Sequence, residues 1–348
     1  MKDSCLPTAR VHGGPDGHGV PLYDFSSNSN ACGPCPDALH AVKQADASRY
    51  PDAGYTDLRH QLAEFHQVAL ARVVLAASAS EFIFRITALN AQRGVRAVYL
   101  PPHAYGDYAH AAQAHGMAQL PEPGAAALCW ACDPSSPFGA ALEGLGRLAD
   151  VAGAAVATGI APVAVVEAVV VLDRAYEPLR LKGALALTAA QLQKVWQLWT
   201  PNKALGLTGV RAAYAIAPLD SQADAQAMDA LCPSWPIGAH GVAMLQAWTQ
   251  ADTQAWLASS LDTLRGWKGK QMAMCESLGW TVLPSHANFF VCHTGLEPSA
   301  ITDLRAHGIK LRDCASFGLP GHVRLSVQPP AAQNALWAAL QIQGVSLK

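Results

Sequence analysis

The sequence has few charged side chains and almost no net charge. Only 14% of its 348 residues are Asp, Glu, Lys or Arg, and the formal net charge is −2. Binding to nucleic acid or to an anionic membrane surface through bulk charge needs a basic excess, so this balance excludes both partners. The chain also has no apolar run long enough to cross a bilayer and no charged start leading into an apolar signal segment. We therefore expect a cytoplasmic protein that acts on a small molecule.

The nine cysteines are an odd number, which favours free thiols in a reducing compartment. Two C-x-x-C pairs occur, Cys32 with Cys35 and Cys129 with Cys132, but nearly a hundred residues separate them. Paired zinc knuckles are about 15–20 residues apart, so no metal site is predicted. A thioredoxin-like pair needs its second Cys inside a helix, whereas the helix expected at "PDALHAVKQA" starts after Cys35. Turn residues beside buried thiols are the favoured interpretation.

Short apolar runs alternate with Ala- and Leu-rich helical stretches along the first two thirds of the chain. The runs "RVVLAAS", "AVYLPP", "ALCWACD" and "APVAVVEAVVVLDRAY" are typical of buried strands, and "SEFIFRITALNAQRG" and "YGDYAHAAQAHG" have helical spacing. This alternation predicts an α/β fold with a mostly parallel sheet covered on both faces. Ligands of such folds bind beyond the carboxyl ends of the strands.

The pattern changes after about residue 236. One long helical stretch over 238–279 is followed by the strand-like runs "WTVLPSHANFFVCH", "IKLRDC" and "HVRLSV". This order predicts a smaller α+β domain behind the large one.

Polar residues that carry chemistry cluster around two of these segments. Asp173 ends the apolar run "VVVLD", where a buried carboxylate is costly unless a cation meets it. Lys203 lies in the Gly-rich segment "TPNKALGLTGVR", and Arg211 follows eight residues later. A Lys for an imine, an Asp for a pyridinium nitrogen and an Arg for a phosphate are what a pyridoxal phosphate site requires. Residue types alone would favour a surface ion pair between Lys203 and Asp173.

The motifs around these residues resemble the aminotransferase class I/II family of pyridoxal-phosphate enzymes. The family's lysine motif, Ser-x-Ser/Thr-Lys-x-x-Gly-Leu-x-Gly-x-Arg, is similar to "TPNKALGLTGVR", with Asn202 in place of the usual hydroxyl. Its Asp-x-Ala-Tyr motif is similar to the segment from Asp173 to Tyr176. Its Asn-Pro-x-Asn-Pro-x-Gly turn resembles "DPSSPFG", where Ser136 replaces an Asn. The similarity runs from about residue 10 to the C-terminus.

This resemblance implies the fold, the cofactor and most of the site. The fold would be fold type I of pyridoxal-phosphate enzymes, with an N-terminal arm over 1–35 packing on the small domain and the active site, a large domain over 36–235 and a small domain over 236–348. Lys203 would hold pyridoxal 5'-phosphate as a Schiff base, with Asp173 and Tyr176 as its catalytic companions. The residues implied in cofactor binding are Ser78, Ala79, Ser80, Tyr105, Ser136, Asp173, Tyr176, Thr200, Asn202, Lys203, Arg211 and Tyr50. Those implied in substrate binding are Arg324, Arg312, His12 and Asn30.

Within the family the chain is most similar to the branch of histidinol-phosphate aminotransferase and threonine-phosphate decarboxylase. "HGG" at 12–14, "DFSSNSNACGPCP" and the setting of Arg312 favour decarboxylation of L-threonine-O-3-phosphate, as in cobalamin synthesis. Tyr176 is the choice of the aminotransferases, which keeps transamination as the alternative. A cofactor-binding scaffold without turnover is a third possibility, because the phosphate-binding turn "AASASEF" lacks the family's glycines.

A partner copy of the chain is also implied. In the resembling segment "SRYPDAGYTDLRHQLAEFHQV", a Tyr reaches the cofactor phosphate of the neighbouring subunit, and Tyr50 matches it. We therefore expect a homodimer with two-fold symmetry and shared active sites.

Overall fold

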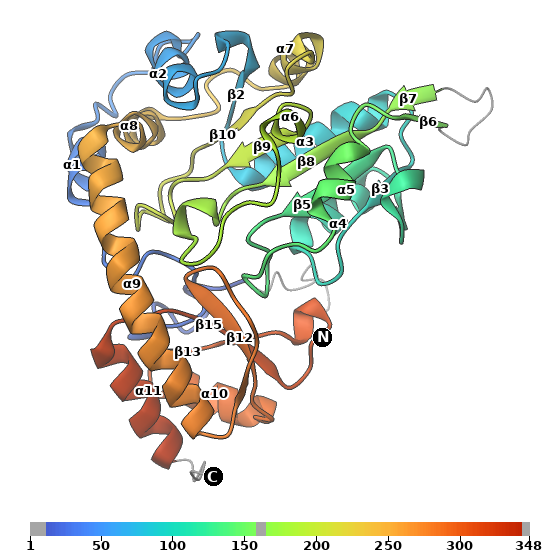
Figure 1. Ribbon diagram of the computed structural model, residues 1–348. Helices are drawn as coiled ribbons and strands as arrows, with labels where there is room; N and C mark the ends of the chain where they lie inside the picture. Colours follow the sequence, from blue (N-terminus) through green and yellow to red (C-terminus); the bar gives the residue numbers. More distant parts are fainter. Residues whose placement is uncertain (1–11, 158–164, 343–348) are drawn as a thin grey trace, which may run out of the picture.

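A seven-stranded sheet forms the centre of the computed structural model, which describes residues 12–157 and 165–342 (Figure 1). In spatial order the strands are β2 (Val73–Ala76), β10 (Ala213–Ile216), β9 (Trp196–Trp199), β8 (Val169–Asp173), β5 (Leu128–Cys132), β3 (Ala97–Tyr99) and β4 (Ala118–Leu120). Only β10 runs antiparallel to its neighbours. The predicted mostly parallel sheet is confirmed.

Both faces of this sheet are buried. Alternate residues of β5 enter different clusters: Leu128 and Trp130 pack with α3 and α4, and Cys129 and Ala131 pack with α5. Side chains on both faces explain why the strands are continuous apolar runs. The helices of this part are α1 (Pro36–Gln44), α2 (Thr56–His66), α3 (Ala79–Gln92), α4 (Gly106–Ala114), α5 (Leu145–Asp150), α6 (Ala189–Leu192) and α7 (Gln222–Ala230). Short 3-10 turns are η1 (Leu70–Arg72), η2 (Pro123–Ala125) and η3 (Glu177–Leu179).

The strand expected over 161–176 is divided. β7 (Val165–Glu167) pairs with β6 (Ala155–Ala157) in a separate two-stranded sheet, and Ala168 interrupts the chain before β8. The amide of Ala168 bonds to the carbonyl of Ala154 and so leaves the main sheet. An apolar run cannot report this change of partner, because both halves have the same composition. Residues 161–164 of the run lie outside the described residues.

The C-terminal part contains a four-stranded antiparallel sheet, whose order is β11 (Thr281–Val282), β12 (Phe289–His293), β15 (His322–Ser326) and β14 (Arg312–Asp313). The 27-residue helix α9 (Ala251–Ser277) runs along this module (Figure 1). The remaining elements here are α10 (Pro298–Ala306), β13 (Ile309–Lys310), η4 (Ala315–Phe317) and α11 (Pro330–Ile342). The predicted α+β character is therefore present.

Two expectations for this part were wrong in detail. The helical stretch over 238–279 is two helices, α8 (Ala239–Trp248) and α9, because Gln250 adopts extended backbone with ψ 143°. α8 packs against α1, which fixes it at an angle to α9. The run "IKLRDC" is two strands: β13 pairs with β1 (Tyr23–Asp24), whereas β14 pairs with β15.

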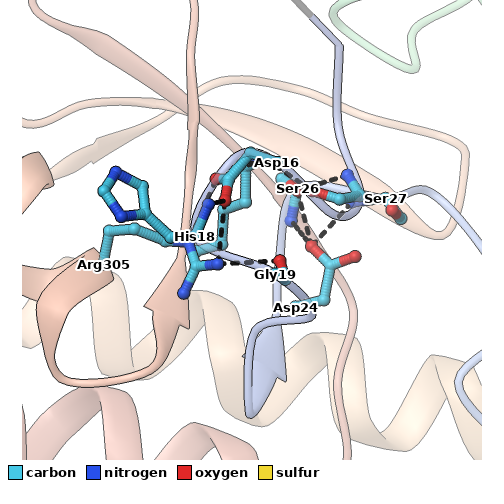
Figure 2. A network of polar contacts seen from close by, with 9 residues as sticks. Asp16, His18, Gly19, Asp24, Ser26, Ser27 and Arg305 are labelled. Atoms are coloured by element: carbon cyan, nitrogen blue, oxygen red, sulfur yellow. Dashed lines mark hydrogen bonds and ion pairs between the residues drawn. The ribbon is translucent and has the colours of Figure 1, made fainter.

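The N-terminal segment is anchored to the C-terminal module. Arg305 on α10 donates hydrogen bonds to the carboxylate of Asp16, and Lys310 forms an ion pair with the same carboxylate at 2.9 Å. Figure 2 shows this network beside Asp24, whose Oδ1 accepts hydrogen bonds from Ser26 and Ser27. The loop before β1 thereby gains a fixed course. Residues 1–11 of the predicted arm lie outside the described residues.

Neither C-x-x-C pair has redox geometry. α1 starts at Pro36, after Cys35, as the sequence predicted. Cys129 and Cys132 lie inside β5, and burial raises the pKa of the Cys129 thiol to about 12. Over 12–157 and 165–342, no group of three or more His, Cys, Asp or Glu side chains is placed to hold a metal ion. Within the same ranges, no helix is long and apolar enough to cross a membrane.

Candidate active site

The sequence-predicted site residues follow the carboxyl ends of parallel strands at one edge of the large sheet. Because β10 is antiparallel to both β2 and β9, those two strands point the same way, as do β8, β5 and β3. Beyond these carboxyl ends come, strand by strand, Ser78 to Ser80 after β2, Lys203 after β9, Asp173 and Tyr176 at the end of β8, Ser136 after β5 and Tyr105 after β3. Residues far apart in sequence are thus brought to the edge where such folds bind ligands.

Asp173 is a buried acid whose two hydrogen-bond donors are neutral groups. Its side chain is 5% exposed, and it accepts hydrogen bonds from Tyr108 Oη at 2.7 Å and from the amide of Ala175 at 2.9 Å. Burial raises the pKa of Asp173, while these two donors and the positive charge of Lys203 act in the opposite direction. A carboxyl in this state favours a cationic partner, and the protonated ring nitrogen of pyridoxal phosphate fits that need.

The loop that carries Lys203 rests on the N-terminal segment. The carbonyl of Lys203 accepts the amide of Asn30 at 2.9 Å, and the carbonyl of Leu205 accepts the amide of Cys35 at 2.8 Å. Gly206 has φ +68°, and a Cβ there would lie 2.6 Å from the carbonyl oxygen of Gly33. Only glycine permits this close approach. The first C-x-x-C segment therefore supports the lysine loop.

The N-terminus of α3 and the hydroxyl of Thr200 offer polar groups that fit a phosphate. Ser78 caps the 14-residue helix α3 by accepting the Glu81 amide at 3.1 Å, so Ala79 and Ser80 lie in its first turn. Helix N-termini of this kind attract anions. Thr200 Oγ1 and Asn202 Oδ1 are buried without a hydrogen-bond partner in the described part of the chain. A buried hydroxyl in this condition has a proton to donate to a bound group.

Tyr105 and Tyr176 have defined partners among the predicted site residues and their neighbours. The hydroxyl of Tyr105 donates to Asp107 at 2.8 Å and lies 3.4 Å from Ser80 Oγ. The Lys203 ammonium lies 5.4 Å from the centre of the Tyr176 ring, which is within cation–π range. Ser136 is buried in the turn after β5.

Two buried arginines face each other across neighbouring strands of the C-terminal module. Arg312 on β14 is directly opposite Arg324 on β15, and each is about one-twentieth exposed. Arg324 Nη2 donates to the Ser26 carbonyl at 3.1 Å, and its Nε has no partner among the described residues. Phe289 lies between this pair and Tyr176, the tyrosine whose ring is close to the Lys203 ammonium. Its ring centre is 5.5 Å from the Arg324 guanidinium and 4.7 Å from the ring centre of Tyr176.

Four further predicted site residues lie on segments outside the helices and strands. Tyr50 is 78% exposed and stacks on Trp235, and Arg211 is exposed after the lysine loop. His12 is exposed, with its ring 6.2 Å from that of Tyr105. The side chain of Asn30 is buried and bonds to Ala204, Ser260 and Cys32 of the same chain. Their roles toward cofactor or substrate stay predictions.

Sequence reasoning missed three residues that the structure brings to this edge. Tyr108 holds Asp173 and lies one helical turn after Tyr105, a spacing that could have indicated it. Asn28 donates to Tyr176 Oη at 3.2 Å, and its Oδ1 is buried without a partner in the described ranges. Phe289 gave no local signal, because an apolar residue in a strand is ordinarily core.

The profile of the family described as "Aminotransferase class I and II" matches residues 20–134 and 159–339. A histidinol-phosphate aminotransferase of Halorubrum lacusprofundi is 29% identical over 326 residues, covering 88% of this chain and 84% of that protein. Histidinol-phosphate aminotransferase 2 of Pseudomonas aeruginosa is 28% identical over 341 residues, covering 92% and 88% respectively.

Solved structures share the fold. Histidinol-phosphate aminotransferase from Sinorhizobium meliloti in complex with pyridoxal-5'-phosphate superposes with a TM-score of 0.76 at 23% identity, covering 92% of this chain and 90% of that one. L-threonine-O-3-phosphate decarboxylase from Porphyromonas gingivalis has a TM-score of 0.74 at 18% identity, covering 92% and 99%. Fold type I is thereby confirmed. The chain belongs to the aminotransferase class I and II family, and it is an enzyme that uses pyridoxal 5'-phosphate.

Proposed function

We propose that this enzyme is an aminotransferase whose amino substrate carries a phosphate, of the histidinol-phosphate type. The observation that carries the proposal is the buried pair of Arg312 and Arg324, which Phe289 and Tyr176 link to Lys203. Like charges directly opposite each other destabilise a sheet, and an anion between them removes that cost. The histidinol-phosphate aminotransferases among the relatives support transamination over the decarboxylation that the N-terminal motifs favoured.

Lys203, Asp173 and Tyr176 would each have a separate role in this reaction. Pyridoxal phosphate, when bound, supplies an aldehyde for amines and a ring that accepts the electron pair released at the substrate Cα. Lys203 would hold the cofactor and, once displaced by the substrate amine, carry the proton to and from Cα. Asp173 would keep the ring nitrogen protonated, which strengthens electron withdrawal. The Tyr176 hydroxyl, oriented by Asn28, would bond to the ring oxygen.

The substrate would be held by its charges. Arg324 lies over the ring of Phe289, which packs against Tyr176. Arg324 is therefore suited to one anionic group of the substrate, and Arg312 to a second. Arg312 already donates to the neutral acceptors Ser316 Oγ and Asp313 O, which fix its guanidinium in place. Fixed guanidinium groups bind phosphate and carboxylate with two parallel hydrogen bonds.

The test is a pair of assays on the holoenzyme. Histidinol phosphate with 2-oxoglutarate should yield glutamate, and phosphothreonine alone should yield no carbon dioxide. Carbon dioxide and aminopropanol phosphate from phosphothreonine, without glutamate from the first mixture, would reverse the proposal and restore the decarboxylase. No product in either mixture, with the cofactor bound, would contradict the proposed substrate.

The same proposal includes a homodimer. Tyr50 and its stacking partner Trp235 are exposed on the single chain, with ring centroids 4.5 Å apart. A Tyr that completes the phosphate site of a neighbour must project from its own subunit, and this placement supports that role.

A further inference from the structure

His103 has a backbone conformation that few non-glycine residues adopt. It lies in the loop between β3 and α4, two residues before Tyr105, with φ +58°. Non-glycine residues in this left-handed region are uncommon, and each costs about 1 kcal/mol or more unless the surroundings enforce it. Such outliers concentrate at functional sites, so the contacts of this side chain are informative.

The imidazole connects the large sheet to the C-terminal module. His103 Nδ1 lies 2.5 Å from the carbonyl oxygen of Phe317 in η4, and because a carbonyl only accepts, Nδ1 carries the proton. The ring also packs edge-to-face on Phe138 at 5.6 Å, in the turn that contains Ser136. One residue of the Tyr105 loop thus contacts two other segments, η4 and the turn after β5.

Phe317 in turn lies against both substrate arginines. Its ring centre is 4.8 Å from the Arg312 guanidinium and 5.8 Å from that of Arg324. Both distances are within the range of attraction between a cation and an aromatic face. Arg312 is also bonded to Ser316, the residue before Phe317. η4 therefore helps to position both guanidinium groups, together with the carbonyls of Ser26 and Asp313.

We infer that His103 is a positioning residue for anion recognition. By donating to the Phe317 carbonyl it holds the Phe317 ring over Arg312 and Arg324, and it thereby makes binding of an anionic substrate depend on the Tyr105 loop. This inference rests on the proposed function only in that the arginines receive the substrate's anion. It assigns His103 a role that acts through Phe317 and the two arginines.

Two substitutions separate the hydrogen bond from the backbone strain. His103→Gly removes the donor but relieves the positive φ, whereas His103→Asn keeps an N–H donor in a residue that tolerates this region. His103→Gly should raise KM for histidinol phosphate by about fivefold to tenfold, the effect of one lost hydrogen bond, with kcat little changed. His103→Asn should recover most of that loss. His115→Gly, an exposed position at the end of α4, is the matched control.

A binding measurement keeps the test independent of turnover. Inorganic phosphate is titrated into each holoenzyme by calorimetry, and the affinity should fall in His103→Gly in parallel with the KM change while the melting temperature holds or rises. Wild-type phosphate affinity in His103→Gly, or equal losses in the Asn and Gly variants, would overturn the inference. If the wild type does not process histidinol phosphate, the proposed function fails, and the phosphate titration still decides the role of His103.

Discussion

At the carboxyl edge of the large sheet, burial changes the pKa of a single acidic side chain. Asp173 is buried beside Tyr108, and burial raises its pKa. Lys203 lies where its charge lowers the pKa of that acid, so the two groups are electrostatically coupled before any ligand binds. A buried acid with a raised pKa, such as Asp173, is typical of functional sites.

Replacing Lys203 by Ala tests the central residue. Loss of the proton carrier should reduce turnover by about 10²–10⁴-fold or more, because that is the range of general acid–base contributions. The visible absorbance of lysine-bound cofactor should vanish as well. Lys194→Ala, at an exposed lysine before β9, serves as the control. Retained turnover in Lys203→Ala would place the chemistry elsewhere.

His66 on α2 predicts an acid sensitivity of the fold. Burial, and secondarily Arg174, lower the pKa of His66 to about 4, and its Nε2 pairs with the Tyr214 hydroxyl at 2.8 Å. Between pH 4 and 6.5 the unfolded chain binds the proton more readily, so stability falls as pH falls through this window. The loss amounts to up to about 3 kcal/mol.

Urea unfolding at several pH values measures this effect. His66→Gln, which keeps a hydrogen-bonding group for Tyr214, should show a shallower decline of the unfolding free energy below pH 6.5 than the wild type. His40→Gln, at an exposed position of α1, should leave the slope unchanged. Identical slopes in the wild type and His66→Gln would assign the acid sensitivity to other groups.

Between elements, an ion-pair network joins the turn after β5 to the segment after β8. Arg180 pairs with the buried carboxylate of Asp133, and Glu177 pairs with Arg180 at 2.7 Å and with Arg174 at 3.4 Å. The other oxygen of Asp133 accepts the Leu142 amide. The turn that contains Ser136 is thereby fixed relative to the Tyr176 segment.

Breaking this network from one side should be costly. Arg180→Met leaves Asp133 buried and should lower the unfolding free energy by about 3 kcal/mol. Asp133→Asn combined with Arg180→Met should cost less than the sum of the single changes, since no buried charge remains unpaired. Denaturant unfolding of all three variants gives the comparison. Strict additivity would show that the two residues do not stabilise each other.

For the whole molecule, the proposed homodimer would use the exposed Tyr50, which stacks on Trp235. The Trp235 indole donates to the Pro51 carbonyl at 3.0 Å, which fixes the projecting segment before any partner binds. Sedimentation of the holoenzyme should therefore show a dimer.

Shared sites make a sharper prediction than size alone. Lys203→Ala and Tyr50→Ala subunits should each be impaired, and mixing them should restore activity. In a hybrid dimer, the Tyr50→Ala subunit has an intact Lys203 and receives Tyr50 from its partner, so one complete site forms. Activity equal to the sum of the separate variants would show that Tyr50 acts within its own subunit or has no role at the site.

The sequence by itself determined the layers of the fold, and it predicted the core of the site. Buried parallel strands need continuous apolar runs, and the resemblance of two local motifs to the aminotransferase class I/II family predicted Lys203, Asp173 and Tyr176. The break between β7 and β8 was hidden, since strand partners leave no mark in composition. Only the tertiary structure decided three contacts. Tyr108 donates to Asp173, Arg312 lies opposite Arg324, and His103 bonds to the Phe317 carbonyl. Each joins residues far apart in the chain, and their meeting depends on register and domain packing rather than on any local pattern.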